Sequence, residues 1–148
     1  MRILALDVGD RRIGIAISDP TGLIARPLRV LERRSKKEDF ATIAALVAEY
    51  GVERVVVGRP LTPKGQVGQQ ARRVEGYAQA LAEALPVPVE LWDERYTTVA
   101  AEEILRETRK PSARRERREV DALAAAVLLQ DYLSACAQAC RVCEGEKP

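Results

Sequence analysis

The first nineteen residues constrain the fold of this chain more than any other stretch. Ile3–Val8 is an almost continuous apolar run, which is typical of a strand buried on both faces. A tight polar turn separates it from a second apolar run, Ile13–Ser18, so the two runs should form a hairpin. Asp7 lies near the tip of the first run, where a carboxylate is costly unless a cation offsets its charge. That cation can be a metal ion or an arginine, and an Asx turn at the hairpin is the alternative.

The rest of the chain alternates strand and helix patterns. Ser35 followed by Glu38 has the form of a helix-capping box, and the helix that it begins should end at Gly51. The pattern predicts a mixed sheet with helices on both faces, the α/β class. The other expected elements are strands at Arg29–Leu31, Val55–Val57 and Val87–Trp92, and helices at about 69–85, 99–108 and 119–140.

The last expected helix follows a basic stretch, residues 106–118, which Pro111 breaks and which we expect to be a loop. Asp121 should therefore open this helix, directly before a long apolar run. The expected inner stripe of the helix is Val120, Leu123, Ala124, Val127 and Leu128.

Length and composition fit one ordinary globular domain. The chain has 148 residues, 47% of them apolar and 31% charged. No apolar run approaches the ~18 residues that a membrane-spanning helix needs, and the amino terminus meets Asp7 too early for a signal peptide. We therefore expect no membrane partner, a cytoplasmic location and a single domain over residues 1–135, with 136–148 as the end of the last helix and a tail.

The charge is unevenly distributed. Residues 26–37 and 106–118 each have a net charge of +5, whereas the whole chain has +2, so the remainder carries −8. Two basic islands on an otherwise acidic chain indicate a footprint for a polyanion such as nucleic acid. Solvated surface with local ion pairs is the alternative for either island.

The residue types present limit the chemistry. The chain has no histidine, which excludes imidazole bases and histidine-type zinc sites. Its three cysteines, Cys136, Cys140 and Cys143, follow a helical i, i+4, i+7 spacing that places them on one stripe. We expect them to be core or interface thiols.

Carboxylates at strand and helix ends are the candidate functional groups. Asp7 ends the first strand, Asp93 and Glu94 end the last expected strand, and Asp121 starts the last helix. Ligand sites form at the carboxyl ends of parallel strands, and oxygen ligands without histidine suit Mg²⁺ or Mn²⁺. Each acid also has a structural alternative: a turn for Asp7, a cap or a pair with Arg95 for Asp93, and a helix-dipole acid for Asp121.

Three basic residues of turns and loops are candidate phosphate contacts. Arg11 and Arg12 follow the first strand and could hold a phosphate, with an ion pair to Asp10 or Asp19 as the alternative. We interpret Asp19 as a turn residue. Lys64, in a polar loop, could contact a backbone phosphate.

Four ordered motifs resemble the YqgF/RuvX family, which is associated with Holliday-junction resolution and pre-16S ribosomal RNA processing. They are DVGDRRIGIAISD at residues 7–19, VVGRPL at 56–61, DERYTT at 93–98 and DALAAA at 121–126. The resemblance covers roughly residues 2–133 and implies a ribonuclease H-like fold with a mixed five-stranded sheet. It also implies a metal-binding and catalytic triad of Asp7, Glu94 and Asp121, loaded with Mg²⁺ or Mn²⁺.

One position of that triad depends on a choice between neighbours. Asp93 and Glu94 should point to opposite faces of their strand, so one of them faces the metal, and we favour Glu94. Arg59 departs from the resemblance, because a smaller apolar residue is usual there.

The resemblance implies a hydrolase acting on phosphodiester bonds in structured nucleic acid. The favoured substrate is pre-16S rRNA, with ribosomal particles as partners, and branched DNA is the alternative. A monomer suffices for trimming RNA, whereas resolving a junction requires a homodimer. Other classes stay open: an ATP-binding module of the actin and sugar-kinase type, or a non-catalytic ribosome-assembly protein that binds RNA. The expected nucleic-acid contacts are Arg11, Arg12, Lys64, Arg95, Arg114, Arg115, Arg117 and Arg118.

Overall fold

The structure, a computed structural model, describes residues 1–59, 68–93 and 114–145, with the side chains of the last helix placed for 121–137. The five strands and three helices of this part follow the predicted order. No helix among them is long and apolar enough to span a membrane. The elements are β1 (Ile3–Val8), β2 (Arg12–Ser18), β3 (Ala25–Glu32), α1 (Lys36–Tyr50), β4 (Arg54–Arg59), α2 (Gln69–Ala84), β5 (Val89–Asp93) and α4 (Arg114–Gly145).

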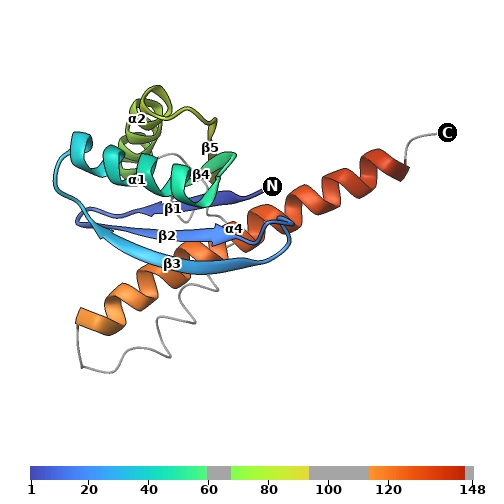
Figure 1. Ribbon diagram of the computed structural model, residues 1–148, viewed down its shortest axis with the longest axis horizontal. Coiled ribbons are helices and arrows are strands. Elements are labelled where there is room, and N and C mark those ends of the chain that lie inside the picture. The colour runs from blue at the N-terminus through green and yellow to red at the C-terminus, as the bar shows by residue number, and fades with distance from the viewer. Residues whose placement is uncertain (60–67, 94–113, 146–148) are drawn as a thin grey trace.

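The five strands form one sheet in the order β3-β2-β1-β4-β5. β2 is antiparallel to both β1 and β3, whereas β4 is parallel to both β1 and β5. The carboxyl ends of β1, β4 and β5 therefore share one edge of the sheet, where α/β proteins place their ligand sites. Helices α1 and α2 cover one face and α4 crosses the other (Figure 1), which confirms the predicted mixed sheet.

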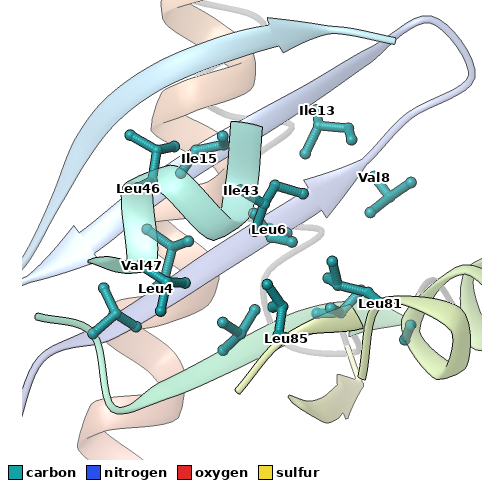
Figure 2. Close-up of a cluster of buried hydrophobic side chains, with 14 of the residues drawn as sticks. Leu4, Leu6, Val8, Ile13, Ile15, Ile43, Leu46, Val47, Leu81 and Leu85 are labelled. Atoms are coloured by element: carbon teal, nitrogen blue, oxygen red, sulfur yellow. The ribbon is translucent and has the colours of Figure 1, made fainter. Parts of the chain in front are cut away.

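The alternation of side chains along β1 divides the core into two layers. Leu4, Leu6 and Val8 pack in the layer beneath α1 and α2, part of which Figure 2 shows. Ile3 and Ala5 pack in the layer against α4. Because side chains alternate with a period of two, Asp7 lies on the α4 face. The strand therefore delivers a carboxylate to the same face of the sheet as the last helix.

Helix α1 begins and ends as the sequence predicts. The Ser35 hydroxyl accepts a hydrogen bond from the Glu38 backbone N–H at 3.2 Å, which satisfies one of the free donors at the start of a helix. At the other end, Gly51 has φ +64°, a left-handed conformation that glycine adopts at low cost, and its N–H caps the Val47 carbonyl. Both ends depend on local chemistry.

Several boundaries differ from the prediction, by one or two residues at β4 and β5 and by more at β3 and α4. β3 spans Ala25–Glu32 rather than Arg29–Leu31, and α4 starts at Arg114, so residues 114–118 are helical rather than a loop. Arginine and glutamate favour helices strongly, and the run after Ala113 contains neither glycine nor proline. Asp121 therefore lies two turns inside α4, not at its start, which removes the helix-dipole explanation for this acid. The predicted helix at 99–108 lies outside the described residues.

The buried face of α4 is also not the predicted one. Leu123, Ala124 and Val127 are only partly buried, although Leu128 is buried as expected. Small side chains dominate the buried face where it crosses the sheet, and small residues on both surfaces let a helix approach closely. A stripe chosen by hydrophobicity favours larger residues and misses this face. Its buried members are Ala122, Ala125, Ala126, Leu128, Leu129, Tyr132 and Leu133.

Asp19 is the turn residue that the sequence predicts. Its carboxylate accepts hydrogen bonds from the backbone N–H groups of Leu23 and Ile24, at 2.8 and 3.0 Å, and from the Thr21 hydroxyl. These bonds, the Thr21 bond first, lower the pKa of Asp19 from 3.8 to about 2. The β2–β3 connection is thus organised around an ionised carboxylate.

A pH-dependent contribution to stability follows. A lowered folded-state pKa stabilises the fold above the unfolded-state value near 3.9, and this contribution is lost as pH falls towards 2. We expect Asp19→Asn to lower the free energy of unfolding at pH 6, and the difference from the native chain to shrink as the pH falls from about 4 and to disappear only below about 2. Urea unfolding of both proteins across this range measures it. A difference that does not change with pH would contradict the assignment.

Candidate functional site

Asp7 and Asp121 meet across a glycine. In the β1–β2 ladder the partner of Asp7 is Gly14, so the two residues share the α4 face. On that face the α4 backbone touches β2: a Cβ added to Gly14 would lie 2.0 Å from the Asp121 carbonyl oxygen. The fold therefore places two of the three predicted metal-binding acids beside each other, although 113 positions separate them in the sequence.

Arg12 joins this pair of acids. It lies two positions before Gly14 on β2, and its Nε is 3.3 Å from a carboxylate oxygen of Asp121. The sequence offered Asp10 or Asp19 as the alternative ion-pair partner of Arg12. Arg12 does form an ion pair, but its partner is Asp121. The positive charge of Arg12 therefore offsets part of the negative charge of the two carboxylates.

Burial affects the charge of Asp121. It raises the pKa of the Asp121 carboxyl above its ordinary value, while the Arg12 guanidinium opposes the rise. A half-buried carboxylate next to a second acid favours a bound cation, because the cation offsets both burial and repulsion. Two carboxylates are donors that hard divalent ions such as Mg²⁺ or Mn²⁺ accept, so the residues present fit the expected metal.

Asp93 faces away from this site. Its carboxylate accepts a hydrogen bond from Arg59 Nε at 2.7 Å, and the same guanidinium contacts Glu75 of α2 at 2.7 Å. The two carboxylates raise the pKa of Arg59. Arg59, the position that departs from the family pattern, therefore ties the ends of β4 and β5 to α2. Trp92, the residue before Asp93, lies on the α4 face and donates to Asp131 at 3.1 Å.

A family profile matches most of the chain. The RuvX profile, described as "Holliday junction resolvase", covers residues 1–135. The chain belongs to the RuvX family. Two relatives carry the name "Putative pre-16S rRNA nuclease". The protein from Chloroflexus aggregans is 51% identical over 134 residues, covering 90% of this chain and 93% of its own length. The protein from Desulforudis audaxviator is 46% identical over 134 residues, covering 90% and 94%.

Solved structures show the same fold at low identity. Thermus thermophilus RuvC in complex with a Holliday junction substrate matches with a TM-score of 0.59 and 20% identity, over 93% of this chain and 96% of that one. The fowlpox virus resolvase in complex with a Holliday junction matches with a TM-score of 0.55 and 12% identity, over 92% and 99%. These neighbours confirm that the RuvX-family chain has the ribonuclease H-like fold.

The described part of the chain includes few of the other predicted site residues of this RuvX-family protein. Arg11 is exposed, and its carbonyl accepts a bond from the Arg33 N–H at 2.9 Å. Glu94, Lys64 and Arg95 lie outside the described residues. Within the described part, no three acids or cysteines form a metal-binding group. Cys136 is half-buried against the α4 layer. Arg114, Arg115, Arg117 and Arg118 are in the first turns of α4, with side chains outside the described part.

Gly14 is the positioning residue that the sequence interpretation missed. A glycine inside a strand often marks a close backbone approach, and this signal was available at position 14. It lies within the first family motif, between Arg12 and the buried residues of β2. From this contact we predict that a larger side chain at position 14 would push Asp121 away from Asp7.

Proposed function

We propose that this RuvX-family protein is a metal-dependent nuclease that hydrolyses phosphodiester bonds in structured nucleic acid, with the 5′ end of pre-16S rRNA as its favoured substrate. The observation that carries the proposal is the juxtaposition of Asp7 and Asp121 through Gly14 at the carboxyl edge of the parallel strands. The name printed for the relatives, "Putative pre-16S rRNA nuclease", supports the choice of substrate.

Asp7, Glu94 and Asp121 would hold Mg²⁺ or Mn²⁺. The bound metal would supply an activated water and stabilise the leaving oxygen. Glu94 is preferred to Asp93 because Arg59 already engages Asp93 on the other face of the sheet. Arg12 would orient a substrate phosphate, since a guanidinium can pair with a phosphate as it pairs with the Asp121 carboxylate. Arg11, on the adjacent turn, would supply a second phosphate contact.

The test is cleavage by the purified full chain. We expect Mg²⁺ or Mn²⁺ to support cutting of an RNA that carries the 5′ extension of 16S rRNA, and excess EDTA to stop it. A four-way DNA junction serves as the comparison substrate. Cells depleted of the protein should accumulate 16S rRNA with an extended 5′ end. Efficient cutting in EDTA would contradict the metal requirement, and cutting of the junction alone would move the substrate to branched DNA.

Two other classes make different predictions. An ATP-binding module would show tight ATP binding by calorimetry, but the cleft of such proteins lies between two domains and needs more than twice this length. A non-catalytic ribosome-assembly protein would bind RNA without turnover under any metal. The paired acids beside Arg12 favour a catalytic site over both.

A further inference from the structure

A basic hollow lies on the other face of the sheet from the paired acids. It has a volume of about 660 Å³ and opens where the β1–β2 turn, the start of α1 and the first turns of α2 meet. This size falls in the range of ~300–1,000 Å³ that is usual for ligand sites. Asp10 is the only acid among its described lining residues. The lining cations, which define the basic pocket, are Arg33, Arg34, Lys36, Arg72 and Arg73.

The cations of the basic pocket come from two separate parts of the sequence. Arg33, Arg34 and Lys36 belong to the first basic island, whereas Arg72 and Arg73 are on α2 and stand outside both islands. In the described part of the chain, no ion pair is found for Lys36, Arg72 or Arg73. The fold therefore gathers more positive charge than the one lining acid, Asp10, can balance, which is typical of an anion-binding site.

Buried polar contacts hold one wall of the basic pocket in place. Arg33 donates to the Gly9 carbonyl at 2.9 Å, and its guanidinium carbon lies 4.9 Å from the centre of the Tyr77 ring. The Tyr77 hydroxyl lies 3.5 Å from the carboxylate of Asp39, which is only 3% exposed. Asp39 also accepts a bond from the Arg34 backbone N–H at 3.2 Å. These contacts fix the segment that carries Arg33 and Arg34 before any ligand arrives.

The basic pocket and the paired acids share the end of β1. Asp7 points to the α4 face, whereas the next residues, Val8, Gly9 and Asp10, line the basic pocket on the α1 and α2 face. A chain of phosphates at the acids could therefore cross the β1–β2 turn and enter the basic pocket. Arginine pairs well with phosphate oxygens, and phosphate contacts set the register of a nucleic acid on a protein.

We propose that the basic pocket binds backbone phosphates of the nucleic-acid strand that continues from the cleavage site. The strand would be held at two places, by the paired acids on one face of the sheet and by the basic pocket on the other. The assignment of one continuous strand to both places rests on the proposed nuclease function. The charge and shape of the basic pocket do not depend on that function.

Equilibrium binding tests the proposal without requiring cleavage. The probe is a fluorescein-labelled single-stranded RNA, titrated with full-length protein in EDTA at several salt concentrations. We expect Arg72→Gln/Arg73→Gln to weaken binding on the order of tenfold at low salt. The slope of the logarithm of the binding constant against the logarithm of the salt concentration should become shallower by about 1.4, because each lost phosphate contact removes ~0.7 for a single strand. Both side chains are exposed on α2, so the helix should be preserved.

A matched variant controls for net charge. Arg2→Gln/Arg54→Gln also removes two partly exposed cations, which lie at the amino ends of β1 and β4, outside the basic pocket and outside both basic islands, and should change affinity by less than about twofold. Equal losses in the two double variants would overturn the proposal, as would absence of RNA binding by the native protein. If pyrophosphate or ATP displaces the RNA at comparable affinity, the basic pocket serves a small polyphosphate, and the strand assignment is overturned.

The two proposals fail separately. A protein that binds RNA through the basic pocket but cuts no substrate contradicts only the nuclease. A protein that cuts RNA while Arg72→Gln/Arg73→Gln binds it normally contradicts only the basic pocket.

Discussion

Replacing Asp7 with asparagine is expected to reduce metal-dependent cleavage by about 1,000-fold or more, because each ~1.4 kcal/mol of lost transition-state stabilisation lowers the rate tenfold and a bound metal contributes several. Asparagine keeps the size of the side chain beside Gly14 but removes its negative charge, which a divalent ion requires. Initial rates of cleavage, measured with saturating Mg²⁺, provide the measurement. Binding of labelled RNA in EDTA should be retained, since the variant keeps the basic pocket intact.

Asp19→Asn is the matched control for this experiment. It makes the same chemical change in the same amino-terminal motif, but at a turn whose contacts are to Thr21, Leu23 and Ile24. Its cleavage rate should stay close to that of the native chain. The same approach separates the neighbouring acids at the end of β5: Glu94→Gln should lose activity, and Asp93→Asn should retain most of it. Native-like cleavage by Asp7→Asn would refute the metal site.

The parts of the fold that depend on local sequence could be predicted. The hairpin follows from two apolar runs and a short polar turn, and the ends of α1 follow from Ser35 and Gly51. Asp19 was identified as a turn residue for the same reason. In each case the residues that make the deciding contacts lie within a few positions of one another, so a short stretch of sequence is enough to predict the contact.

The parts that depend on packing between distant segments could not be predicted. Hydrophobicity favoured large residues for the inner stripe of α4, whereas the sheet accepts Ala122, Ala125 and Ala126. The partner of Arg12 is Asp121, far away in sequence, rather than a nearby acid. The basic pocket likewise needs α2 to bring Arg72 and Arg73 to the first basic island. The basic stretch broken by Pro111 also suggested a loop over residues 106–118, where helix-forming arginines and glutamates begin α4 at Arg114.

Gly14→Ala is expected to destabilise the protein by roughly 3 kcal/mol or more, the upper end of what overpacking a core usually costs. The added methyl group would lie 2.0 Å from the Asp121 carbonyl oxygen and 3.3 Å from the Ala122 nitrogen. These are backbone atoms of a long helix, so they cannot move as a flexible side chain would. Either α4 must shift from the sheet or β2 must bend. Urea unfolding of the variant and the native chain gives the difference in free energy.

Gly76→Ala provides a control of opposite sign. Gly76 lies inside α2, and a methyl group added there meets nothing within 4 Å, so this change should stabilise the protein by up to about 1 kcal/mol.

The single tryptophan reports on the position of α4, because Trp92 donates to Asp131 and packs edge-on against Tyr132. If Gly14→Ala shifts the helix, the Trp92 emission should move to longer wavelength and cleavage should fall, because Asp121 moves with α4 away from Asp7. Stability and emission unchanged from the native chain would mean that the helix tolerates the methyl group and that Gly14 does not set the distance between the two acids.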